Sequence, residues 1–156
     1  MKRLRFLPAV LALALVPSLQ AEDKEGLRVT VTKTVLDTDS ERFGVRRRRE
    51  VTFKQTALKV RIQNLRTTEL AESKLTYTVQ LDRAGRPKRA RDRTRTGSET
   101  VPALKSNVSA ELIVGAVELR AANFAEKDEI DGWKLVFQLA DGRTVSFQSQ
   151  GFTEIP

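Results

Sequence analysis

Strict alternation of apolar and polar residues is the feature that most constrains how this chain folds. Over residues 75–81, four apolar residues alternate with polar ones without a break, namely Leu75, Tyr77, Val79 and Leu81. Residues 27–35 repeat the pattern, with Lys33 at one of the apolar positions. Because successive side chains of a β-strand point to opposite faces, each segment is predicted to be a strand with one face against a core.

Two other segments change phase part-way along. Val51 and Phe53 fall on odd positions, whereas the apolar residues of 58–62 fall on even ones. Since a one-residue shift turns the apolar set to the other face, this predicts two strands, or one bulged or bent strand, with the break at residues 55–57. Residues 108–119 shift in the same way, which predicts a strand bulged near Gly115. A short helix over residues 117–125 is the alternative, because that stretch contains good helix formers.

A hairpin is predicted near the C-terminal end, where residues 133–139 and 144–148 flank Ala140-Asp141-Gly142. A three-residue loop with Gly142 in the left-handed region pairs Phe137 with Val145 and Leu135 with Phe147, which leaves one face apolar. A two-residue loop mixes apolar and polar residues on both faces. We therefore predict the three-residue loop.

Composition excludes most catalytic machinery. The 156 residues, enough for one domain, include 28 Lys and Arg, 20 Asp and Glu, no His and no Cys. Without imidazole or thiol there is no Ser-His-Asp or Cys-His site, no His-ligated zinc, haem or iron–sulfur centre, and no disulfide. No pair of carboxylates stands out for glycoside chemistry. We expect no catalytic residue, metal ligand or cofactor, and hence a protein that is not an enzyme.

The first 21 residues have the pattern of a secretory signal peptide. Lys2, Arg3 and Arg5 precede an apolar run at residues 7–16, which is too short for a membrane span of roughly 20 residues. Cleavage after Ala21 is predicted to leave a domain of residues 22–156 without a membrane span, in the periplasm or secreted from a bacterium. A buried N-terminal helix is the alternative. Cleavage removes three positive charges, so the net charge falls from +8 to +5.

About seven strands joined by turns, without a long amphipathic helix, predict an all-β fold, a single antiparallel β-sandwich with immunoglobulin-like topology. Residues 57–148 resemble small exported bacterial sandwich modules of the FxLYD and fibronectin-type-III-like kind. The resemblance rests on a strand ending in Asn (58–64), a polar turn closing on Leu70, a strand with Tyr77 (75–79) and a link before the next strand (104–108). It implies this fold and a binding or scaffolding role. The Pro-Gly often found in that link is absent here.

Two basic clusters are the candidate anion-binding residues. They are Arg46, Arg47, Arg48 and Arg49 in the first, and Arg86, Lys88, Arg89, Arg91, Arg93 and Arg95 in the second. The guanidinium fork suits phosphate, sulfate and carboxylate, which points to an acidic glycan, lipopolysaccharide or nucleic acid. Neither cluster contains an aromatic residue to stack on bases. The alternative is a pair of solvated loops whose charge keeps sheet edges from pairing.

Three smaller features have structural interpretations. The carboxylates of residues 37–41 alternate as in a calcium loop, but Arg42 stands where the loop requires Gly. The acidic residues of 126–131 are typical of a solvated turn. Trp133, the single Trp, is expected to anchor the core or its rim, although it could also stack on a sugar.

Taken together, the sequence favours a non-catalytic exported binding or structural module of the bacterial envelope. It is expected to associate with proteins or cell-surface components through sheet edges and loops. The alternative is a polyanion-binding protein that uses its Arg-rich loops.

Overall fold

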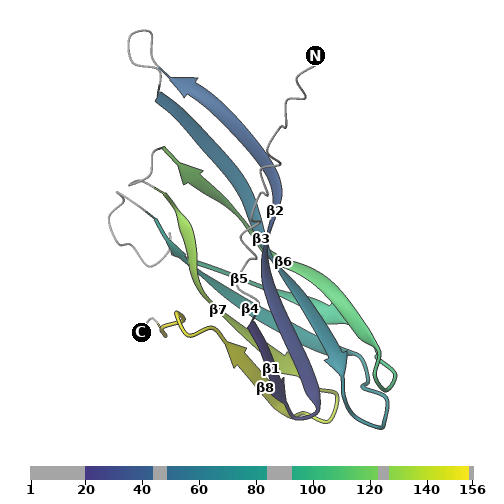
Figure 1. The fold of residues 1–156 in the computed structure, drawn as a ribbon. Coiled ribbons are helices and arrows are strands. Elements are labelled where there is room, and N and C mark those ends of the chain that lie inside the picture. Colours follow the sequence, from purple (N-terminus) through teal and green to yellow (C-terminus); the bar gives the residue numbers. More distant parts are fainter. Residues whose placement is uncertain (1–19, 44–48, 84–92, 123–126, 155–156) are drawn as a thin grey trace, which may run out of the picture.

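The computed structural model describes residues 20–43, 49–83, 93–122 and 127–154, and strands are the only regular secondary structure in these ranges (Figure 1). The strands are β1 (Gln20–Lys24), β2 (Leu27–Phe43), β3 (Arg49–Asn64), β4 (Ser73–Asp82), β5 (Thr94–Val101), β6 (Ser109–Ala121), β7 (Glu129–Gln138) and β8 (Thr144–Gln148). The predicted all-β class is confirmed, with eight strands instead of about seven.

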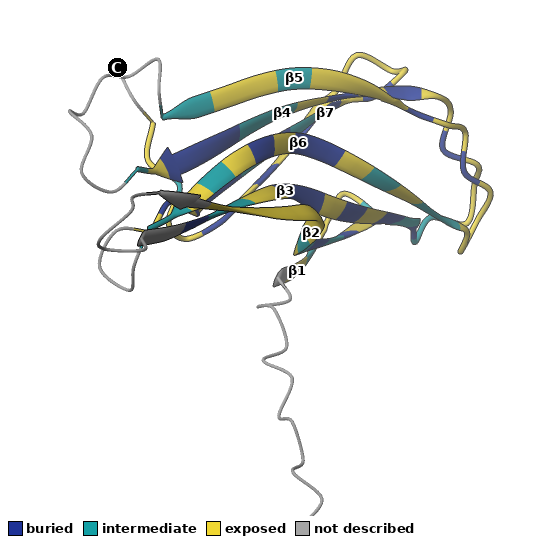
Figure 2. Cartoon of the chain, turned by 90° about the horizontal axis from the view of Figure 1, so that it is seen from above, coloured by how far each residue is buried: buried dark blue, intermediate teal, exposed yellow. Residues whose placement is uncertain are grey.

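Two antiparallel sheets of four strands lie face to face as layers (Figure 2). The first has the order β1-β2-β3-β6, and the second has the order β5-β4-β7-β8. Strands β2, β3 and β6 take the places of immunoglobulin strands A, B and E, and β5, β4, β7 and β8 those of C′, C, F and G. The predicted antiparallel β-sandwich is confirmed, and its strand order follows that of an immunoglobulin-like fold.

The core lies between the layers and uses the residues that the alternation placed inside. Leu75 and Val79 of β4 have no exposed surface, and Tyr77 between them is half-buried against the core. Phe137 and Phe147 pack edge to face across β7 and β8, with ring centroids 5.6 Å apart. That separation is within the range in which aromatic pairs add to simple burial.

The C-terminal hairpin has the predicted register. Leu135 pairs with Phe147 and Phe137 pairs with Val145, and both phenylalanine side chains are fully buried. Gly142 has φ +82°, which is the left-handed conformation expected for the third loop residue. The need for one apolar face therefore identified the loop length correctly.

The phase changes in the sequence come from bulges. Strand β3 runs unbroken, so of the two interpretations of residues 55–57 the bent strand is correct. The extra residues lie in its neighbours: Leu36 in β2, and a two-residue stretch of β6 opposite Ala57. Gly115 in that stretch has φ +63°, and a Cβ there would lie 2.6 Å from Val79 Cγ2, so the bulge requires glycine. The alternative helix over residues 117–125 is wrong for 117–121, which belong to β6, and residues 123–126 lie outside the described part.

Two strands were not predicted: β1, whose first two residues fall in the predicted signal peptide, and β5. The second basic cluster was expected to continue to Arg95, yet β5 begins at Thr94 and continues to Val101. Five of its eight residues are exposed, Thr94 and Gly97 are half-buried, and only Val101 is buried, so the strand shows no alternation. An edge strand of this kind does not carry the apolar pattern by which sequence reveals strands.

Candidate binding surfaces

At one end of the sandwich lie the strand ends between which the two basic clusters fall in the sequence (Figure 1). These strand ends flank the connections from β2 to β3, β4 to β5 and β6 to β7. Their flanks are linked by strand pairing, because Thr52 lies opposite Ala121, Gln80 opposite Thr94, and Leu81 opposite Ile130. The topology therefore brings the starting points of the two clusters to the same end of the molecule.

A partly buried ion pair ties this end together. Arg83 Nη1 lies 3.4 Å from Asp128 Oδ2, and the Asp128 side chain is only 5% exposed. The same carboxylate accepts the backbone N–H of Arg120 at 3.3 Å, and the Asp128 N–H donates to the Arg120 carbonyl at 2.8 Å. Asp128, predicted to sit in a solvated acidic turn, is instead a buried structural residue. It links the end of β4 to the end of β6 and the start of β7.

The structure describes only part of the predicted anion-binding set. Arg46, Arg47, Arg48, Arg86, Lys88, Arg89 and Arg91 lie outside the described residues. Arg49 is the first residue of β3, Arg93 is half-buried just before β5, and Arg95 is exposed within β5.

The net charge is concentrated in the same segments. Ten of the 28 basic and two of the 20 acidic residues fall outside the described ranges, which leaves 18 of each sign on the described sandwich. The surplus of positive charge thus comes from residues outside the described ranges, namely residues 1–19 and the basic clusters at 46–48 and 86–91.

The longest hairpin projects as an arm. Strands β2 and β3 contain 17 and 16 residues, and they pair along their whole length from Leu27 to Phe43. Strand β1 covers the outer edge of β2 only from Leu27 to Val31. Beyond that point, residues 36–41 are all exposed, and the far half of the hairpin extends past β1 (Figures 1 and 2). We call residues 32–43 of β2 and 49–56 of β3 the β2–β3 arm.

The base of the arm is anchored to the other sheet. Lys33, which occupies a core position in the alternation, donates from Nζ to the Ile130 carbonyl of β7 at 2.6 Å. Val35 was expected to continue the buried face, but it is 53% exposed because the second sheet does not extend over it. The buried face of β2 therefore ends near Val31, although the strand continues for twelve more residues.

The acidic segment of residues 37–41 is part of this arm. It lies in β2, where residues two apart along the strand are about 7 Å apart and cannot converge on one ion. Among the described residues no group of three or more acidic side chains could hold a metal ion. Acidic and hydroxyl residues alternate in this segment, which could have indicated a strand. Without apolar residues, however, the alternation does not show a buried face.

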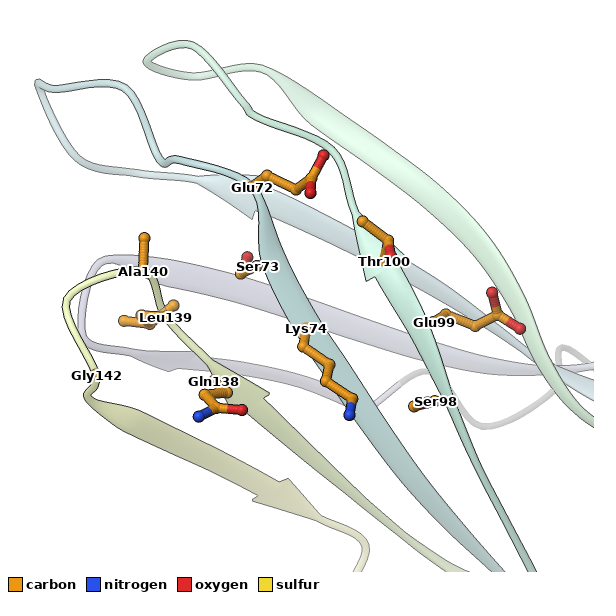
Figure 3. Close-up of a pocket in the computed structure, with 10 residues that line it drawn as sticks. All are labelled: Glu72, Ser73, Lys74, Ser98, Glu99, Thr100, Gln138, Leu139, Ala140 and Gly142. Atoms are coloured by element: carbon orange, nitrogen blue, oxygen red, sulfur yellow. The ribbon is translucent and has the colours of Figure 1, made fainter.

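A shallow groove of about 500 Å³ lies at the opposite end, between the start of β4 and the β7–β8 turn (Figure 3). Its polar groups include Glu72, Lys74, Glu99 and Gln138, and Leu139 is its only large apolar residue. It has no aromatic lining on which a sugar ring could stack. Trp133 does not serve that purpose on any surface, because it is only 6% exposed and packs in the core as the sequence favoured.

Comparisons with known proteins do not assign the chain to a family. No protein-family model matches the sequence, and no curated protein matches it. Within the described ranges, no helix is long and apolar enough to span a membrane.

Proposed function

We propose that this chain is a non-catalytic binding module of the bacterial envelope that associates with another protein through the β2–β3 arm. The observation that carries the proposal is the outer edge of β2. In the described part of the chain, nothing pairs with this edge from Thr32 to Phe43. An unpaired strand edge presents a row of backbone donors and acceptors, and such edges recruit extended segments of other proteins. The resemblance to exported sandwich modules supports the same role.

Export is part of this proposal and has a structural consequence. Cleavage after Ala21 would remove Gln20 and Ala21, the two β1 residues that pair with Val31 and Thr30. The remaining three residues of β1 would still pair with β2, so the mature sandwich keeps its first sheet. The free edge of β2 would then start two residues earlier. Mass spectrometry of the protein from its native host should find Glu22, or a residue within a few positions of it, at the N-terminus. An intact Met1 contradicts export.

Site-specific photo-crosslinking tests the arm. A photoreactive amino acid replaces Thr38 on the arm in one variant and Thr100 on β5 in the control, both exposed positions on strands. In the native host, the variant at position 38 should form a crosslink to a defined partner, identified by mass spectrometry, that the variant at position 100 does not form. Equal crosslinking from both positions, or none from position 38, refutes the role of the arm.

Polyanion binding is the second candidate function, and it is supported by the strand ends that flank the two basic clusters, which lie at the same end of the sandwich. Binding through many Lys and Arg contacts to phosphate or sulfate releases counterions and weakens steeply with salt. The test is retention on heparin between low and physiological ionic strength. Serine replaces the basic residues of 46–49 and 86–91 in one variant, and Lys54, Lys74 and Lys105 in a control. The first variant loses eight positive charges and the control loses three, so a fall in retention that is equal per charge removed reflects net charge alone and refutes the candidate.

A further inference from the structure

We infer that the free edge of β2 accepts an extended peptide segment with Lys or Arg at alternate positions, as an added antiparallel strand. This inference rests on the proposed function and names the partner chemistry. Three features of residues 32–41 point to this partner: the backbone donors of the edge, the negative charge beside them, and the apolar residues at the base of the arm.

Two backbone N–H groups on the arm donate to the carboxylate of the preceding residue and not to a neighbouring strand. The N–H of Thr38 donates to Asp37 Oδ1 at 2.8 Å, and the N–H of Ser40 donates to Asp39 Oδ1 at 2.7 Å. Residues two apart in a strand direct their N–H groups to the same edge. Because these two amides bond to side chains of their own strand and not to β3, they face the outer edge. Each carboxylate oxygen occupies the place where a carbonyl oxygen of a further strand would lie.

The carboxylates define the charge of the incoming strand. Asp37, Asp39 and Glu41 lie on one face of β2, all three are exposed, and none forms an ion pair with a described residue. Directly opposed residues of neighbouring strands interact, and opposite charges there are favourable. A strand with basic residues at every second position would place one beside each carboxylate, while its carbonyl groups accept from Thr38 and Ser40.

The same charges disfavour a second copy of this edge as the partner. Antiparallel pairing of two identical strands about Asp39 places Asp39 against Asp39 and Asp37 against Glu41. Like charges directly opposite each other are destabilising. The edge therefore selects against itself and in favour of a basic segment.

Exposed apolar residues on β2 define the order of residue types along the added antiparallel strand. Val35 is 53% exposed and Leu36 is 44% exposed, and they precede the acidic residues along β2. In an antiparallel partner, the residues opposite Val35 and Leu36 come after those opposite the carboxylates. The predicted partner thus reads, from its N-terminal end, as alternating basic residues followed by apolar ones.

The direct test uses the mature protein and the synthetic peptide Lys-Thr-Lys-Thr-Lys-Val-Val with a fluorescent label. Two control peptides have the same charge: the reversed sequence, and the same sequence with N-methyl groups that prevent strand pairing along one edge. Fluorescence anisotropy should show at least roughly tenfold weaker binding of both controls. Hydrogen exchange followed by NMR should show slower exchange of the Thr38 and Ser40 amides when the first peptide is bound.

A charge variant isolates the contribution of the carboxylates. Asp37→Asn, Asp39→Asn and Glu41→Gln together keep a side-chain oxygen at each position but remove three charges, and should weaken peptide binding roughly tenfold. The matched control removes three exposed charges elsewhere through Glu69→Gln, Glu72→Gln and Glu99→Gln. It should bind the peptide as the parent does.

Each outcome is decisive. Equal binding of all three peptides, or unchanged exchange at Thr38 and Ser40, overturns strand addition. Equal losses in the two charge variants overturn recognition by the arm carboxylates. If no peptide binds while photo-crosslinking from position 38 still captures a partner, the inference fails and the proposed function stands. Loss of that crosslink refutes the proposed function itself.

Discussion

Replacement of Asn64 is expected to destabilise the sandwich more than any other polar substitution at its ends. Asn64 is the last residue of β3 and has no exposed surface. Its side-chain amide donates to the carbonyls of Thr68 and Leu104, both at 2.9 Å, and its Oδ1 accepts the Arg66 N–H at 3.0 Å. These three bonds join the β3–β4 turn to the link between β5 and β6.

The magnitude for Asn64→Leu follows from the groups left behind. The substitution keeps the volume of the side chain but leaves three groups without their hydrogen-bond partner. These are the buried carbonyl of Leu104 and the partly buried Thr68 carbonyl and Arg66 N–H. Each unmade bond costs about 1–3 kcal/mol when fully buried and less when water can reach it. The Leu104 carbonyl still accepts the Leu70 N–H at 2.8 Å, which reduces its share. We therefore expect a loss of about 3 kcal/mol, equivalent for a domain of this size to a fall in Tm of roughly 10 °C.

Urea and thermal unfolding can be followed by the fluorescence of Trp133, the single Trp, which is buried and becomes exposed on unfolding. Gln63→Leu is the control, because it removes an amide from the neighbouring half-buried residue, whose side chain forms no hydrogen bond to any described residue. Asn64→Asp should be worse than Asn64→Leu at neutral pH, since a carboxylate would face two carbonyl oxygens. Losses below about 0.5 kcal/mol for both Asn64 variants would refute the assigned role of this network.

Three further predictions concern the hairpin, the basic end and pH. Gly142→Ala should cost about 1 kcal/mol in urea unfolding, because φ is +82° while nothing lies within 4 Å to clash; no loss would contradict the left-handed assignment. Asp128→Asn removes the ion pair with Arg83 and should cost about 1–2 kcal/mol, with faster amide exchange at the ends of β4 and β6; unchanged exchange would contradict its linking role. Stability should be flat from about pH 5.5 to 8, because the chain has no His. A hydrogen bond from Lys59 lowers the pKa of Glu111 below its ordinary 4.5, so its contribution is present above that value and is lost as pH falls further; a transition near pH 6.5 would contradict this account.

Much of the fold could be predicted from the chain because its core obeys simple alternation. The hairpin register followed from the positions of Leu135, Phe137, Val145 and Phe147, since only one loop length puts them on one face. Strand β5 could not be predicted in this way, because it lies at an edge with most of its side chains in solvent. The apolar pattern reflects burial of one face, so a strand whose side chains are mostly exposed has no such pattern in its sequence.

The candidate sites divide along similar lines. The clusters of basic residues are visible in the sequence, but their common end of the sandwich follows only from the crossing of the chain between sheets. The acidic charge of residues 37–41 is visible in the sequence, yet the position of this segment on an unpaired edge depends on where β1 begins, at Gln20 opposite Val31.

The amino-acid sequence by itself determined the all-β class, the phase of the buried strands, and the chemistry that an absence of His and Cys excludes. These are local properties, because each depends on residue type and on spacing along one strand. Only the tertiary structure decided that β2 continues beyond the part that pairs with β1, and that Asp128 is buried beside Arg83. Both depend on contacts between segments far apart in the chain, and the spacing of residues within a segment contains no information about which distant strand ends beside it.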